Sequence, residues 1–226
     1  MWGVLMGDRA AKDALYDGFA AVAKALGNGR RAEIVDLLTQ GERSVEEVAE
    51  EIGQSVANAS QHLQHLLRAG LVTTRRQGNR IHYSLADRRV AELWAAVRDV
   101  AAAHVAKIDR LATAYLGDRS GLQTVTREQL AERLRRGEVV LIDVRPYAEF
   151  RQGHIPGAVS VPIDMLGQQM LDLGKDREVV AYCRGAFCVY ADDAVRAMLA
   201  KGYRAARLED GFPEWARSGR PSESTA

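Results

Sequence analysis

Residues 179–190 read Val-Val-Ala-Tyr-Cys-Arg-Gly-Ala-Phe-Cys-Val-Tyr. Four good strand formers lead into Cys183, a short turn with Gly185 follows, and an Ala-rich helical segment covers residues 189–200. A cysteine between the end of a strand and the start of a helix lies near backbone N–H groups and the positive end of the helix dipole. Both features favour the thiolate, which is the nucleophilic form. We therefore expect Cys183 to be a nucleophile and to have a lower pKa than Cys188.

A second motif lies upstream, where residues 141–158 read Leu-Ile-Asp-Val-Arg-Pro-Tyr-Ala-Glu-Phe-Arg-Gln-Gly-His-Ile-Pro-Gly-Ala. Strand and helix patterns alternate from residue 126 to the segment near Trp215, which is typical of a small α/β domain with a mostly parallel sheet. Such sheets place their sites at the carboxyl ends of strands, where the cysteine loop would lie. With Leu208 and the Gly-Phe-Pro-Glu-Trp ending at 211–215, these motifs resemble the rhodanese family over residues 124–222.

The rhodanese resemblance implies a sulfane sulfur, carried as a persulfide on Cys183. Phosphatases and arsenate reductases with a related fold use a longer loop of the form Cys-x5-Arg, whereas the sixth residue after Cys183 here is Val189. The shorter loop resembles the sulfur-carrying branch, so a phosphatase is rejected. The expected catalytic side chains and loop amides are those of Cys183, Cys188 and Arg184, and of Gly185, Ala186 and Phe187.

Cys188 departs from the simplest rhodanese pattern, in which an Arg is common at the end of the loop. It is either a small apolar residue at the start of the helix or a resolving thiol that attacks a persulfide on Cys183, giving a disulfide or trisulfide. Without the usual Arg, fast turnover of anionic donors such as thiosulfate is not expected.

The first half of the chain has a different pattern. Residues 16–26 and 30–38 have helical periodicity, and Ser44 with Glu47 forms a capping box for a helix over 45–52. Ser55 begins another helix over 56–69, and the tight turn between these two helices is typical of a helix-turn-helix. Strands over 71–75 and 81–85 with a turn at 77–79 form a wing.

The motifs Ser-Val-Glu-Glu-Val-Ala, Ala-Ser-Gln-His-Leu-Gln-His-Leu and Ala-Gly-Leu-Val-Thr make residues 15–115 resemble the ArsR family of winged-helix repressors. That family implies a homodimer that binds double-stranded operator DNA and releases it when an inducer binds. Asn and Gln side chains pair with adenine edges, and a basic wing suits phosphates. The candidate DNA-binding residues are Ala57, Asn58, Ser60, Gln61, His62 and Gln64 on the helix and Arg75, Arg76 and Arg80 on the wing.

Residues 90–116 form one long helical pattern with an apolar stripe, which indicates either a core helix or, given the family, a helix that packs against its twin in a dimer. Residues 117–121 read Gly-Asp-Arg-Ser-Gly and are expected to be a linker. We expect an α+β winged helix-turn-helix domain over 1–118 and an α/β rhodanese-like domain over 119–226. The tail over 221–226 is expected to be disordered.

Composition limits the partners. The charges of the 31 basic and 30 acidic residues nearly cancel, so the net charge of the chain indicates no particular binding partner. No apolar run is long enough to span a membrane. Residues 1–6 are too short for a signal sequence, so they are expected to be a disordered tail or the product of a start codon that is placed too early. Two cysteines in one loop are no secreted disulfide framework, which favours the cytoplasm.

No cysteine precedes Cys183, and His104 stands alone on an apolar stripe, so neither a metal site nor a cofactor is expected. The sequence predicts a DNA-binding transcriptional regulator of the repressor type that senses or handles small sulfur species (persulfide, polysulfide or thiosulfate) through Cys183. One alternative is a thiosulfate or persulfide sulfurtransferase with a tethered DNA-binding domain. Another is an arsenic-linked regulator, against which the missing Cys pair of the first domain counts.

Overall fold

A computed structural model describes residues 8–225, so the segment 1–6 lies outside the described residues. The chain divides into two compact units between Arg98 and Asp99. The two units are defined by which residues contact each other most in the folded chain. The domain boundary expected between residues 118 and 119 remains a prediction. Within the described residues, no helix is long and apolar enough to cross a membrane.

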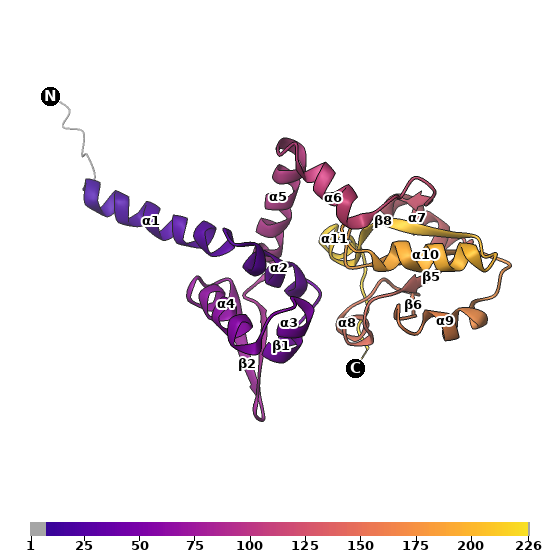
Figure 1. Ribbon diagram of the computed structural model, residues 1–226, viewed down its shortest axis with the longest axis horizontal. Helices are drawn as coiled ribbons and strands as arrows, with labels where there is room; N and C mark the ends of the chain where they lie inside the picture. The colour runs from indigo at the N-terminus through magenta and orange to yellow at the C-terminus, as the bar shows by residue number, and fades with distance from the viewer. Residues whose placement is uncertain (1–7, 226) are drawn as a thin grey trace. The chain divides into compact units, whose positions relative to one another are not determined.

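The first unit is a winged helix-turn-helix, as the sequence predicts. Its elements are α1 (Arg9–Leu26), α2 (Gly29–Leu38), β1 (Arg43–Ser44), α3 (Val45–Glu51), α4 (Val56–Arg68), β2 (Val72–Gln77), β3 (Arg80–Leu85) and the start of α5 (Arg88–His104). The strands form an antiparallel sheet in the order β1-β3-β2, and the β2–β3 hairpin projects beyond the helices as the wing (Figure 1).

Local capping explains why α3 and α4 begin where they do. Ser44 accepts a hydrogen bond from the Glu47 amide while the Glu47 carboxylate accepts one from the Ser44 amide, so the predicted capping box is confirmed. The Ser55 hydroxyl likewise accepts from the Asn58 amide at the start of α4. Apolar residues of α2, α3 and α4, among them Ile34, Val48 and Leu63, then share one buried core, which fixes the orientation of α4.

The expected single helix over residues 90–116 is wrong. Helix α5 ends at His104, and α6 (Ile108–Leu116) follows after a turn that is closed by a 2.8 Å bond from the Ile108 amide to the Val105 carbonyl. Residues 105–107 contain no Gly or Pro that explains the break. The apolar stripe continues across it, and for that reason periodicity alone did not reveal it.

The second unit is an α/β domain with a five-stranded parallel sheet in the order β4-β8-β7-β5-β6 (Figure 1). Its elements after α6 are β4 (Thr124–Val125), α7 (Arg127–Arg135), β5 (Val139–Asp143), α8 (Tyr147–Gln152), β6 (Val159–Ser160), α9 (Leu166–Gln169), η1 (Met170–Leu173), β7 (Glu178–Cys183), α10 (Tyr190–Ala200), β8 (Ala205–Gly211) and α11 (Phe212–Arg217).

The central strand β7 explains where the cysteine lies. Its side chains alternate between the two faces of the sheet. Val179, Ala181 and Cys183 belong to the core that contains Val195 of α10, whereas Val180 and Tyr182 belong to the other core, with residues of α7 and α11. Cys183 is the last residue of β7, so it lies at the carboxyl edge of the sheet on the α10 side.

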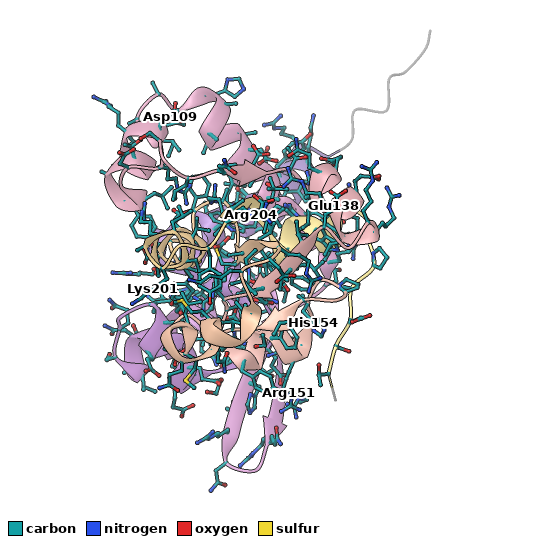
Figure 2. The ribbon with its side chains drawn as sticks, turned by 90° about the vertical axis from the view of Figure 1, so that its right-hand side faces the viewer. Asp109, Glu138, Arg151, His154, Lys201 and Arg204 are labelled. Carbon is teal, nitrogen blue, oxygen red and sulfur yellow. The ribbon has the colours of Figure 1, made fainter. Side chains whose placement is uncertain are left out.

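The expectation of a disordered tail is wrong, and the expected linker has contacts of its own. The segment 117–121 contacts the second unit, because Arg196 donates to the Asp118 carbonyl and Arg119 is ion-paired to Asp192, and its role as a linker remains a prediction. The tail is ordered over 221–225: the Trp215 indole donates to the Pro221 carbonyl at 2.8 Å, and His154 and Glu223 form a β-bridge. Figure 2 shows this tail passing beside His154. Specific partners, which composition cannot reveal, hold both segments.

Candidate functional site

Residues of the motif over 141–158 support the site structurally and do not contain the two cysteines. Asp143, at the end of β5, and Arg145 are both fully buried and form an ion pair at 2.6 Å. Arg145 also donates to the Gly153 carbonyl at 2.6 Å, and its guanidinium stacks over the Phe212 ring. A buried charge needs such compensation. The pair therefore fixes the loop after β5 beside the cysteine loop.

The cysteine loop is packed closely against the end of β8. A Cβ atom added at Gly211 would lie 2.3 Å from the Gly185 nitrogen and 2.5 Å from the Cys183 carbonyl oxygen, and both are backbone atoms. Only glycine fits there, which explains the Gly at the start of the Gly-Phe-Pro-Glu-Trp ending. As a result, the turn after Cys183 has little room to shift away from the sheet.

Cys183 is 1% exposed, and its Sγ lies 3.8 Å from the Gly185 carbonyl oxygen and 3.7 Å from that of Cys188. Burial raises the pKa of the Cys183 thiol well above its ordinary value, and the neighbouring Cys188 raises it further. Hydrogen bonds from the amides of Gly185 and Ala191 oppose this rise but are smaller. The expectation that Cys183 has the lower pKa is therefore wrong, because burial outweighs the amides and the helix end.

Cys188 has the opposite character. The hydrogen bond from the Cys183 thiol is the main cause that lowers the pKa of Cys188, from 9.0 to about 7. The amides of Arg184 and Tyr190 and the positive charge of Arg184 lower it further, while burial opposes them. Near neutral pH, about half of the pairs therefore hold a thiolate on Cys188 beside the Cys183 thiol.

The guanidinium of Arg184 is already engaged by a carboxylate. Its Nε and Nη2 donate to Glu149, at 2.9 and 2.5 Å, and the Glu149 side chain is fully buried. The guanidinium carbon also lies 5.5 Å from the centre of the Tyr190 ring. Arg184 therefore supports the Cys188 thiolate by its charge while being held by Glu149.

The carbonyl side of the loop has a partner that the sequence did not reveal. Arg119 donates to the Ala186 carbonyl at 2.9 Å and the Cys188 carbonyl at 3.4 Å, and its Nε donates to the buried Asp192 at 2.6 Å. Asp192 also pairs with Arg207 of β8 at 2.8 Å. In the sequence, Arg119 looks like a linker residue and Asp192 like an ordinary acid in the first turn of a helix. No local pattern indicates that they meet at the loop.

The predicted loop residues are therefore brought together in space. The Cys188 amide donates to the Gly185 carbonyl at 3.1 Å, which closes the turn. Phe187 lies at the tip of the loop and is 41% exposed. The arrangement is a dithiol at the carboxyl edge of a parallel sheet, with cations on two sides. Among the side chains that the structure describes, which exclude those of residues 171 and 172, no group of three or more His, Cys, Asp or Glu could hold a metal.

In the first unit, α4 presents most of the predicted DNA-binding residues to solvent. Gln61 is exposed, but Gln64 donates to the Tyr83 hydroxyl of β3 at 3.1 Å, which restrains its amide. Asn58 donates weakly to Gln54 at 3.4 Å. The exposed set is Ala57, Asn58, Gln61 and Gln64, and Ser60 and His62 are half-buried.

The wing arginines differ from one another. Arg75 is exposed and forms a two-pronged ion pair with Glu42, at 2.6 and 3.1 Å, which lowers the pKa of Glu42. Arg76 donates to the Gly78 carbonyl at the tip of the hairpin, and Arg80 is exposed. The window around the wing contains no acid in sequence, but Glu42 comes from the loop before β1. Arg75 is thus partly neutralised in a way that the local sequence does not show.

These observations define a class: a helix-turn-helix regulator joined to a rhodanese-like domain. Residues 26–75 match the model of a helix-turn-helix domain, and residues 126–218 match the model of a rhodanese-like domain. The chain is 46% identical over 222 residues to the HTH-type transcriptional regulator Rv0324 of Mycobacterium tuberculosis, covering 98% of this chain and 97% of that protein. The chain belongs to this family of HTH-type transcriptional regulators, with an ArsR-like winged helix.

Two further similarities each cover one half of the chain. A sulfurtransferase of Allochromatium vinosum is 40% identical over 96 residues, or 42% of this chain and 88% of that protein. The homodimeric winged helix-turn-helix DNA-binding domain (fragment 1–100) of Mb0332 from Mycobacterium bovis is 48% identical, covers 46% of this chain and 94% of that one, and has a TM-score of 0.42.

Proposed function

We propose that the protein is a homodimeric repressor that binds operator DNA through α4 and the wing and releases it when a polysulfide oxidises Cys183 and Cys188. The observation that carries this proposal is the pair of thiols in one loop at the carboxyl end of β7, in which the Cys183 thiol lowers the pKa of Cys188 to about 7. A thiolate beside a second thiol is the arrangement that redox-sensing cysteine pairs require. The described part of the first unit contains no thiol that could act instead.

The chemistry is a two-electron oxidation of the dithiol. The Cys188 thiolate attacks a sulfur atom of the polysulfide, an S–S bond of the polysulfide breaks, and the shortened polysulfide leaves as an anion. Cys183 then loses its proton and attacks Cys188 Sγ, which forms the disulfide and releases hydrosulfide. The dithiol supplies two electrons and the sulfane sulfur accepts them. If the persulfide forms first on Cys183, as the rhodanese resemblance implies, attack by Cys188 gives the same disulfide.

Arg119 is the proposed route from the loop to the dimer. It holds the carbonyls of Ala186 and Cys188 and lies three residues after the last residue of α6. Closing a disulfide pulls Cys188 toward Cys183 and moves its carbonyl, so the hydrogen bonds of Arg119 must change. Allosteric coupling is typically about 1 to 3 kcal/mol. A change of about 1.4 kcal/mol lowers operator affinity about tenfold.

Exposed apolar side chains support the proposed dimer. On α1, Leu15, Tyr16 and Phe19 are each more than half exposed, and so are Leu111 and Tyr115 on α6. Apolar stripes of this kind on helices indicate surfaces that a partner covers. A second copy of the chain is the proposed partner, as the ArsR-like fold implies.

The experiment is intact mass spectrometry of the reduced protein after exposure to polysulfide, with duplex binding measured on the same sample. We expect a mass decrease equal to one hydrogen molecule, peptides joined through Cys183 and Cys188, and weaker DNA binding. A protein that gains no modification at either cysteine contradicts the proposal.

The second candidate is a sulfurtransferase whose DNA-binding domain only localises it. The similarity to a sulfurtransferase over the second unit favours it. The ion pair between Arg184 and Glu149 argues against efficient use of thiosulfate, because this cation is already engaged by a carboxylate. Rapid, repeated transfer of sulfur from thiosulfate to cyanide, with DNA affinity unchanged by oxidation, is the outcome that favours the enzyme.

A further inference from the structure

A basic pocket lies on the first unit, outside the predicted DNA-binding residues. Its volume is about 380 Å³, and no carboxylate lines it. Helix α1 contributes Lys24, α2 contributes Arg31, and α4 contributes His65 and Arg68; the remaining lining residues are Ala21, Ala25 and Ala69. Small apolar walls with cations around them leave room for an anion.

Two of the cations of the pocket, Arg31 and Arg68, are held by local contacts. Arg31 donates to the Ala25 carbonyl at 2.5 Å and to the Lys24 carbonyl at 2.9 Å, and so satisfies the end of α1. Arg68 Nη2 lies 3.2 Å from His65 Nδ1, and because an arginine can only donate, the ring nitrogen accepts. Side chains that are already ordered lose less entropy when they bind a ligand.

The electrostatics of the neighbouring histidine agree with this geometry. Burial lowers the pKa of His62, and the positive charges of Arg31 and Arg30 lower it further. Arg30 is compensated by Glu33 at 2.8 Å, but the residues that line the pocket include no acid. The region therefore has a positive potential.

The pocket lies on one flank of α4. At 100° per residue, Gln61 lies near the centre of the exposed arc of this helix. Gln64 lies on one side of that centre and is bonded to Tyr83 of the wing sheet. His65 and His62 lie on the other side, toward Arg31. Arg68 lies close to that centre, so the pocket extends from the proposed base-reading face to the flank away from the wing sheet.

We propose that this pocket binds a backbone phosphate of DNA, on the flank of α4 opposite the wing. A helix in the major groove lies between two sugar–phosphate backbones, so cations on both flanks can each reach one strand. Contacts to phosphates fix the register and orientation of the protein without reading sequence. This inference rests on the DNA binding of the proposed function and adds a site to it. A free phosphate ion has the same chemistry and is separated from the DNA phosphate by the test.

The test compares full-length wild type with Lys24→Gln, Arg68→Gln and the double variant. Arg31 is left intact because it also caps α1. Arg89→Gln is the matched control, since Arg89 is an exposed cation of the same unit that pairs only locally with Asp87. The probe is a mixed-sequence DNA duplex that spans two half-sites, and its dissociation constant is measured as a function of salt concentration.

Removing one cation that neutralises a phosphate lowers the slope of log affinity against log salt by about 0.9, and in a dimer each substitution removes one such cation from each protomer. We expect a shallower slope and a similar decrease in affinity for every duplex sequence with the pocket variants, and a wild-type slope with Arg89→Gln. A wild-type slope in the folded double variant overturns the inference. If the double variant fails to fold, the slope of Lys24→Gln alone decides.

A second arm measures thermal stability in inorganic phosphate against chloride at equal ionic strength. Stabilisation of the wild type but not of the variants, together with an unchanged DNA slope, would mean that the pocket binds a free anion, and it also overturns the DNA assignment. A wild type that binds no duplex at all contradicts the proposed function rather than this site. The two failures are therefore distinguishable.

Discussion

The ionisation of Cys188 can be tested by removing its hydrogen-bond donor. In Cys183→Ala the thiol that lowers the pKa of Cys188 is absent, whereas Cys183→Ser retains a hydroxyl donor and serves as the matched control. With a pKa of about 7, about half of Cys188 is thiolate at pH 7, against about one in a hundred at the ordinary value of 9.0. Nucleophilicity falls with pKa, with a Brønsted coefficient of about 0.4–0.5, so this lowering costs about tenfold in intrinsic reactivity.

The gain in thiolate is about 50-fold and the decrease in reactivity about tenfold, so Cys188 should react with iodoacetamide about fivefold faster at pH 7 than an ordinary thiol. Its rate should rise through pH 7 and level off above it, because the reactive form is the deprotonated one. In Cys183→Ala the midpoint of this profile should move to higher pH. The assay is time-resolved alkylation with peptide mapping across neutral pH. Faster labelling of Cys183 than of Cys188, or a wild-type midpoint at the ordinary value, would refute the reasoning.

Three further predictions concern the fold, the coupling and the DNA. Gly211→Ala should lower the free energy of unfolding by about 2 to 3 kcal/mol in a denaturant titration, because the added Cβ would overlap backbone atoms. Gly167→Ala is the control, because a Cβ at Gly167 meets open space and should leave the stability unchanged. Equal stabilities of the two variants would contradict the close packing at Gly211. Arg119→Met should still form the disulfide by mass but lose the response of DNA affinity to polysulfide, and a retained response would exclude the proposed route. Gln61→Ala should change which duplexes are preferred in a binding selection while Arg80→Ala should weaken all of them, and the reverse result would exclude this division of roles.

Much of the fold was predictable because local signals agree with it. The capping boxes at Ser44 and Thr126 lie at the starts of α3 and α7, and the apolar run before Cys183 is a central strand, β7. The wing follows α4 directly, as the turn at Gly78 indicates. These features depend on residues close in sequence, so sequence patterns reveal them.

The site was less predictable because it depends on interactions between distant residues. The order of the two cysteine pKa values follows from the burial of Cys183, and no motif reports burial. Arg119 meets the loop across 67 positions, and Arg75 meets Glu42 across 33. The cysteine loop was located correctly from its sequence, but the partners that set its charge were not.

The most direct test of the central claim is operator affinity with and without polysulfide for the wild type, Cys183→Ser and Cys188→Ser. The operator is first selected from a random-sequence pool with the reduced protein. We expect polysulfide to weaken binding about tenfold in the wild type, corresponding to about 1.4 kcal/mol, and to leave both variants unchanged because neither can close the disulfide. Identical affinities in all the measurements would contradict the account, and the second unit would then have no control over the first.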